Sequence, residues 1–113
     1  MQTDKLIELV YQALEDMKAK EIVTLDVRER SSVTDYMIIA SGTSKRHVGS
    51  VAEDVVVKVK ATGLLPMGTE GQGVSDWILV DLGDVVVHVM MPDARAFYDL
   101  ERLWGIESEG VKE

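Results

Sequence analysis

Three features of this 113-residue sequence could support chemistry: a turn of small residues, a set of carboxylates and two histidines. The turn, Ser41-Gly42-Thr43-Ser44, follows an apolar run, and a helical pattern begins after it. Free backbone N–H groups at such a turn can bind a phosphate. Magnesium-dependent phosphoryl transfer would also need carboxylates that converge on the metal. Carboxylates that converge from one strand must be two residues apart, but Asp81 and Asp84 are three apart across a different expected turn. We therefore favour the interpretation of Ser41–Ser44 as a tight turn that caps a helix, and a nucleotide-binding enzyme is the alternative.

The histidines offer no catalytic arrangement that the sequence can identify. His47 falls in the first turn of an expected helix, and His88 falls in an expected strand on the face shared by Val86 and Met90. A catalytic histidine needs a nucleophile or an orienting carboxylate within hydrogen-bond reach. We interpret His88 as a packed histidine with one ring nitrogen hydrogen-bonded. With no cysteine and only two histidines, thiol catalysis, disulfides and an ordinary structural zinc site are excluded, and we expect no metal and no cofactor.

The aromatic residues are more informative, because they gather among acids. Trp77 opens an expected strand with Leu79 and Asp81 on the same face, and Tyr98 is followed by an acid. The net charge is −8, and residues 61–113 hold three of the 12 Lys and Arg but ten of the 20 Asp and Glu. Such a region would repel a nucleic-acid backbone, whereas aromatics ringed by acids are typical of a surface that binds a basic protein. The alternative is that these aromatics cap the edge of the core and that the acidity only maintains solubility.

The composition is that of one folded domain, with 46% apolar and 28% charged residues. No apolar run approaches the roughly 20 residues that span a bilayer. The first residues lack the basic-then-apolar pattern of a secretion signal. We expect a cytoplasmic protein that does not contact membranes.

Hydrophobic periodicity predicts the elements that must position these groups. Apolar stripes predict helices over 4–20, with Thr3 as N-cap, and over 45–62, with Thr43 or Ser44 as N-cap. The run Val55–Val59 is β-branched, but the helical stripe continues through it to Gly63. Pro92 opens a closing helix over 92–104 that ends at Gly105. Its expected inward stripe is Phe97, Leu100, Leu103 and Trp104.

Alternating and continuous apolar runs predict five strands, and Gly83-Asp84 fits a two-residue hairpin turn. The order is α-β-β-α-β-β-β-α, which predicts an α/β (α+β) fold: a single domain over 1–105 with a small mixed β-sheet flanked by helices. Residues 106–113 are expected to be a polar, disordered tail. The expected strands cover residues 22–27, 36–40, 64–67, 76–82 and 85–91.

Five motifs follow one another along nearly the whole chain with ordinary gaps between them. They are Asp35–Val48, Glu70-Gly71, Asp76–Asp81, Gly83–Met90 and Arg95–Trp104. Together they resemble the ribosomal silencing factor (Iojap-like) family over about residues 4–104. This resemblance implies a nucleotidyltransferase-like fold without working catalytic carboxylates, and therefore no enzyme activity. It also implies binding to ribosomal protein L-fourteen on the large ribosomal subunit, which sterically blocks association with the small subunit and represses translation under nutrient limitation.

The resemblance also assigns candidate residues. Trp77 matches the family's interface tryptophan and Tyr98 its interface tyrosine. Further contacts are expected around them at Asp76, Asp81, Met90, Met91, Arg95, Leu100 and Glu101, although Leu100 also fits a core position. Peripheral contact with ribosomal RNA through Arg28, Arg30, Lys45 and Arg46, and a homodimer when the protein is free, stay open.

Overall fold

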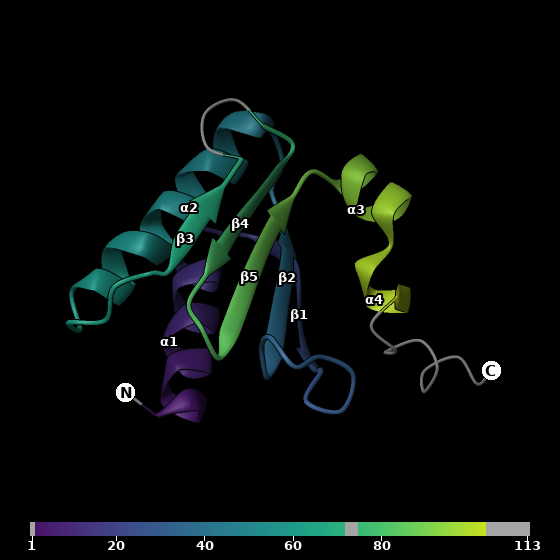
Figure 1. Cartoon of the computed structure of the whole chain (residues 1–113). Coiled ribbons are helices and arrows are strands. Elements are labelled where there is room, and N and C mark those ends of the chain that lie inside the picture. Colours follow the sequence, from purple (N-terminus) through teal and green to yellow (C-terminus); the bar gives the residue numbers. More distant parts are fainter. Residues whose placement is uncertain (1, 72–74, 104–113) are drawn as a thin grey trace.

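A five-stranded mixed sheet with helices on both faces forms the fold of this computed structural model, which describes residues 2–71 and 75–103. In Figure 1, α1 and α2 lie on one side of the sheet, and α3 and α4 lie on the other. The expected α+β fold is confirmed. In chain order the elements are α1 (Thr3–Asp16), β1 (Lys20–Asp26), β2 (Tyr36–Ser41), α2 (Lys45–Lys60), β3 (Gly68–Glu70), β4 (Trp77–Asp81), β5 (Val85–Met90), α3 (Pro92–Tyr98) and α4 (Leu100–Leu103).

The strand order of the sheet is β1-β2-β5-β4-β3. β2 and β5 are parallel, with Ser41 opposite Met90, and the other neighbouring pairs are antiparallel. The carboxyl ends of β2 and β5 therefore lie at one edge, where α2 leaves toward one face of the sheet and α3 toward the other. β4 and β5 are joined by the expected hairpin, in which Gly83 has a φ of 93° and Leu82 N–H donates to the Val85 carbonyl at 2.9 Å.

The larger core lies between the sheet and the pair α1 and α2. The valines of Val55–Val59 continue the buried stripe of α2, so tertiary burial outweighs their preference for a strand. The N-cap of α2 is Ser44, whose hydroxyl accepts from His47 N–H at 3.0 Å. The buried side chains of the two helices are Leu6, Val10, Ala13, Leu14, Val48, Val51, Ala52, Val55 and Val59.

The smaller core lies on the other face of the sheet, beneath α3 and α4. Ala94 of α3 and Leu100 of α4 pack there against buried side chains of β1, β2 and β5. His88 is a polar residue on this face and is only 4% exposed. The two short helices thus attach to the sheet through few side chains, and their positions depend on specific contacts.

Two expectations near the ends of elements were wrong. α1 ends at Asp16 instead of residue 20, because Lys18 adopts a φ of 63° and the chain turns into β1. The N-cap position is Gln2, and Thr3 lies inside the helix with its hydroxyl donating to Asp84 at 3.0 Å.

The expected strand over 64–67 was also wrong, because the edge strand β3 covers Gly68–Glu70. Pro66 has no N–H to donate to a neighbouring strand. Backbone pairing begins one residue later, where Met67 N–H donates to the Asp81 carbonyl at 2.7 Å.

The single helix expected over 92–104 is divided at Asp99, which has a left-handed conformation with φ 52° and ψ 52°. The break turns Leu100 into the smaller core, and Phe97, expected to point inward, is 80% exposed. Trp104, Gly105 and the expected tail over 106–113 lie outside the described residues, as does the expected inward placement of the Leu103 side chain.

Candidate protein-binding surface

Three aromatic side chains form one cluster where β4 begins and α3 ends. The ring centroids of Trp77 and Tyr98 are 4.6 Å apart with the rings tilted by 47°, and Phe97 meets Tyr98 edge-on at 5.0 Å. Phe97 is 80% exposed and Tyr98 50% exposed, whereas Trp77 is partly buried against the smaller core. We call Trp77, Phe97 and Tyr98 the aromatic surface. Exposed aromatic rings held against one another present apolar area at little entropic cost, which suits a binding surface.

Trp77 is held in place at its backbone and at its ring. The Ser75 hydroxyl accepts from Trp77 N–H at 3.2 Å and donates to the Trp77 carbonyl at 3.0 Å. Beside it, Met91 N–H donates to the Asp76 carbonyl at 2.8 Å, which extends the pairing of β4 with β5. The indole Nε1–H donates to His88 Nδ1 at 2.9 Å. The base of the aromatic surface is therefore a rigid part of the sheet.

His88 is packed and has one hydrogen-bonded ring nitrogen, as expected from the sequence. Burial lowers the pKa of His88 to about 4, so the ring is neutral at pH 7. Because Nδ1 accepts the bond from Trp77, the proton of the neutral ring lies on Nε2. Nε2 is buried and has no hydrogen-bond partner among the described residues.

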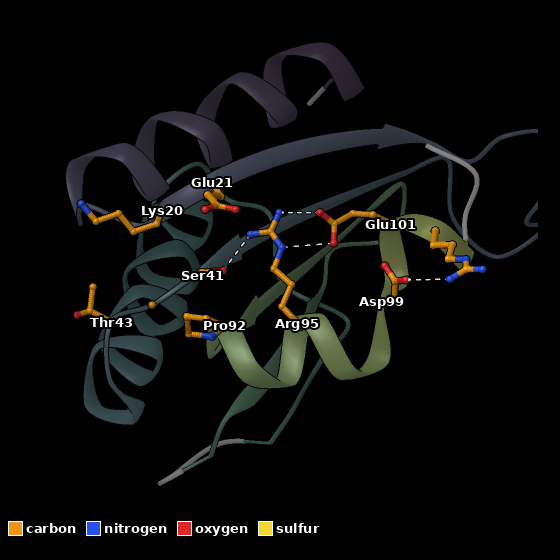
Figure 2. A pocket seen from close by; sticks show the side chains of 11 residues that line it. Lys20, Glu21, Ser41, Thr43, Pro92, Arg95, Asp99 and Glu101 are labelled. Carbon is orange, nitrogen blue, oxygen red and sulfur yellow. Dashed lines mark hydrogen bonds and ion pairs between the residues drawn. The ribbon is translucent and has the colours of Figure 1, made fainter. Parts of the chain in front are cut away.

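Arg95 connects the two short helices to the sheet. Its Nε and Nη2 donate to the two Glu101 carboxylate oxygens at 3.3 and 2.9 Å, and its Nη1 donates to the Ser41 hydroxyl at 2.9 Å. Figure 2 shows these bonds converging from α3, α4 and β2. Arg95 is only 8% exposed, so this bidentate pair is screened little by water. It fixes the chain on both sides of the Asp99 break, and hence the place of Tyr98.

A cavity of about 800 Å³ lies beside Arg95, at the carboxyl ends of β2 and β5. The turn Ser41–Ser44 borders the cavity, but one of the turn's N–H groups already has a partner within the protein, because Thr43 N–H donates to His47 Nδ1 at 2.9 Å. The residues that line the cavity are Lys20, Glu21, Ser41, Gly42, Thr43, Pro92, Arg95, Ala96, Asp99, Glu101 and Arg102.

The acids of the nucleotide-binding alternative lie away from this turn. Asp81 ends β4 and accepts from Gly83 N–H at 2.9 Å, and Asp84 bonds to Thr3. Both lie near the Tyr36 end of the sheet, opposite the Ser41 end. Within residues 2–71 and 75–103, no group of three or more His, Asp or Glu side chains could hold a metal ion. The arrangement therefore does not combine an anion-binding turn with converging carboxylates.

The structure brings some of the candidate contacts together and separates others. Asp76 is exposed and directly precedes Trp77. Met91 pairs with Asp76 through its backbone, but its half-buried side chain packs against the larger core on the other face of the sheet. Asp81, on the same face of β4 as Trp77, lies at the far end of that strand. Glu101 is half-buried in its ion pair. The candidates whose side chains lie inside the fold are Met90, Arg95 and Leu100.

Sequence reasoning missed two residues of this region. Phe97 was assigned to the core, and His88 was not connected with Trp77. The outward position of Phe97 depends on how α3 packs on the sheet through Ala94 and Arg95, which the apolar pattern does not give. The diagonal contact of His88 with Trp77 depends on the register of β4 against β5, in which Trp77 is opposite Met90 and Leu79 is opposite His88.

Comparison with known proteins gives the family. The sequence model described as "Ribosomal silencing factor during starvation" matches residues 1–113. The chain belongs to the ribosomal silencing factor family. It is 46% identical over 99 residues to "Ribosomal silencing factor RsfS" of Haemophilus influenzae, covering 88% of this chain and 97% of that protein. As a ribosomal silencing factor, it has a role in ribosome silencing, and its relatives carry the names of regulators rather than enzymes.

Other similarities extend the family beyond bacteria and confirm the fold. The chain is 33% identical over 107 residues to mouse "Mitochondrial assembly of ribosomal large subunit protein 1", covering 90% of this chain and 46% of that protein. A crystal structure of a protein from Chromobacterium violaceum superposes with a TM-score of 0.91 at 46% identity, covering 93% of this chain and 88% of that one. In the part of this silencing factor that the structure describes, no helix is long and apolar enough to cross a membrane.

Proposed function

We propose that this protein silences ribosomes by occlusion, binding ribosomal protein L-fourteen on the large subunit and so blocking association with the small subunit. Translation is thereby repressed when nutrients are limiting. The role in ribosome silencing follows from the family. The partner and the steric mechanism come from the resemblance of the sequence motifs, and the aromatic surface is the observation that supports them most directly.

The aromatic surface has the anatomy of a protein-binding hot spot. Phe97 and Tyr98 stand out from α3 over a partly buried Trp77, so a partner would contact exposed rings backed by a rigid support. Tryptophan and tyrosine are over-represented among the residues that dominate binding energy in protein interfaces. Met91 is half-buried against the larger core, on the face of the sheet opposite to that of Trp77, so it stays a peripheral candidate contact. We assign the main binding contacts to Trp77, Phe97 and Tyr98.

Acidic residues around the aromatic surface favour a basic partner. Asp76 and Asp93 are exposed, and Asp99 is half-buried beside Tyr98. Carboxylates at the rim of an interface raise the association rate and orient the partner more than they increase affinity. Ribosomal proteins are basic as a class, so a surface of this charge is complementary to one. The association rate should therefore fall as the salt concentration rises.

In this proposal the buried candidate residues position the aromatic surface and do not contact the partner themselves. Arg95, Glu101 and Leu100 hold α3 and α4 on the sheet, and Met90 lies opposite Trp77 in the neighbouring strand, buried in the smaller core. They act on the partner through the positions of Tyr98 and Trp77. Asp81 lies four residues along β4 from Trp77 on the same face, so in this proposal it is a contact at the rim. The mechanism is occlusion and contains no chemical step.

Contact with ribosomal RNA and self-association are secondary parts of the proposal. Arg28 already binds the Asp26 carboxylate at 2.6 Å and lies 5.3 Å from the Tyr36 ring centroid. We therefore expect Arg30, Lys45 and Arg46, more than Arg28, to approach RNA. A homodimer of the free protein would cover the same aromatic surface and would compete with the ribosome.

Light scattering of subunit joining tests the occlusion step. Purified large and small subunits are mixed after the large subunits have been incubated with the protein. We expect the wild-type protein to suppress joining in proportion to its occupancy of large subunits. Addition of excess isolated ribosomal protein L-fourteen should restore joining, since it competes for the aromatic surface. Normal joining at full occupancy would contradict occlusion, and binding that L-fourteen does not compete for would contradict the assigned partner.

A further inference from the structure

The indole of Trp77 lies against the imidazole of His88, which projects from the neighbouring strand. The ring centroids are 5.8 Å apart and the planes are tilted by 41°. Trp77 Nε1–H donates to His88 Nδ1 at 2.9 Å. His88 lies opposite Leu79 in β4 and opposite Ile39 in β2, two register positions away from the pair of Trp77 with Met90. The contact is therefore a diagonal one across the β4 and β5 pair.

Packing alone does not require a histidine at this position. The other residues of β5 are Val85, Val86, Val87, Val89 and Met90, all buried and all apolar. An apolar side chain of similar volume would fill the same space without a buried polar atom. His88 instead carries a buried Nε2–H that has no partner among the described residues, which costs stability. What His88 adds is an acceptor for the indole N–H, which can only donate.

We infer that His88 is a positioning residue of the aromatic surface: its Nδ1 fixes the orientation of the Trp77 indole on which Tyr98 packs. The inference deepens the proposed function and rests on it. A free indole on a strand can adopt several rotamers, and each alternative would remove the support beneath Tyr98. By holding one rotamer before the partner arrives, His88 lowers the entropic cost of binding.

Two variants distinguish the role of His88 as a hydrogen-bond acceptor from its role in filling space. His88→Leu substitutes an apolar side chain of similar size and removes the acceptor, whereas His88→Gln keeps an acceptor in its amide oxygen. Both are made with Trp104→Phe, which leaves Trp77 as the single tryptophan of the chain. We expect His88→Leu to shift the Trp77 emission and to weaken binding to large subunits by about five- to tenfold. His88→Gln should restore much of both.

Trp77→Ala in the same binding assay distinguishes a failure of the positioning role of His88 from a failure of the proposed binding surface. If Trp77→Ala weakens binding while His88→Leu leaves emission and affinity unchanged, the positioning role is overturned and the proposed surface stands. If Trp77→Ala binds like the wild-type protein, the proposed surface fails, and the emission of the His88 variants still decides whether His88 orients Trp77.

Nitrogen-15 NMR of the wild-type protein tests the same bond without any substitution. We expect His88 to be neutral with its proton on Nε2, and we expect the Trp77 indole proton to be shifted and slow to exchange. A proton on Nδ1 would overturn the inference, because the ring could then not accept the bond from Trp77. This measurement stays decisive if His88→Leu does not fold.

Discussion

The guanidinium of Arg95 binds both carboxylate oxygens of Glu101 across the left-handed break at Asp99, and its third bond reaches Ser41 of β2. Three elements therefore meet at one buried side chain. Arg95 and Glu101 were expected among the partner contacts around Trp77 and Tyr98. Their geometry makes them internal supports of Tyr98, which precedes the break, and we propose that they act on the partner through it.

Removal of Arg95 should destabilise the fold and the surface together. Arg95→Met leaves the Glu101 carboxylate and the Ser41 hydroxyl without their partner, so we expect a loss of about 3 kcal/mol in the free energy of unfolding. Urea unfolding measures it. Arg28→Ala is the matched control, because it breaks an exposed pair with Asp26 and should have a much smaller effect. Equal losses in the two variants would contradict a buried support.

The stability of the protein should fall as the pH is lowered from about 6.5 to about 4 because of His88. Burial lowers the pKa of His88 from 6.5 to about 4, so between these values the unfolded chain binds a proton that the folded chain does not. The free energy of unfolding therefore falls through this range, by up to about 3 kcal/mol at the acid end. Urea unfolding at a series of pH values measures this dependence.

His88→Gln is the control for that pH dependence, since glutamine does not titrate. Asp16 and Asp26 also have lowered pKa values, from hydrogen bonds with Gln12 and Arg28 respectively, and they contribute equally to both proteins. The difference between the two proteins should therefore isolate His88. Parallel pH profiles would show that His88 does not stay neutral in the fold.

Phe97→Ala should weaken ribosome binding without changing stability. The side chain is 80% exposed, so its removal costs the fold little, whereas a partner on the aromatic surface would lose a large contact. Tyr98→Ala should cost about 2 kcal/mol or more of binding free energy. Titration of large subunits measures both, with Tyr11→Ala of α1 as a partly exposed tyrosine on the other face. An effect of Tyr11→Ala equal to that of Tyr98→Ala would contradict the assignment.

Gly71→Ala should be strongly destabilising and should disturb Trp77. A Cβ at Gly71 would lie 2.3 Å from the Trp77 carbonyl oxygen, and the φ of 84° already disfavours a side chain. We expect a loss of about 2 kcal/mol or more in the free energy of unfolding, measured by urea. Gly68→Ala is the matched control, since its Cβ meets no atom within 4 Å. A large effect at Gly68 and none at Gly71 would refute this explanation.

The parts of the fold that follow from local chemistry could be predicted from the sequence. The hairpin at Gly83-Asp84 and a cap of α2 at Thr43 or Ser44 depend on residues close in the chain. The apolar stripe that continues the helix through Val55–Val59 was also visible, although their local preference is for a strand. The order of elements and the single mixed sheet followed from these. The aromatic and acidic character of the proposed binding surface was also visible, because residue types and charge can be read from the sequence.

The parts that were wrong depend on single backbone conformations or on contacts between distant residues. The end of α1 and the break at Asp99 both use left-handed conformations at non-glycine residues, which propensity does not predict. The outward position of Phe97 depends on how α3 packs on the sheet, where Arg95 turns toward Ser41, 54 positions earlier in the chain. The contact of Trp77 with His88 likewise required the register of two strands.

Co-sedimentation with separated large and small ribosomal subunits tests the central claim most directly. The wild-type protein should sediment with large subunits only. Trp77→Ala/Tyr98→Ala, shown to be folded by circular dichroism, should remain in the supernatant, while Tyr11→Ala should sediment like the wild type. A folded double variant that still sediments with large subunits would contradict the aromatic surface, and wild-type protein that sediments with neither subunit would contradict the proposed function itself.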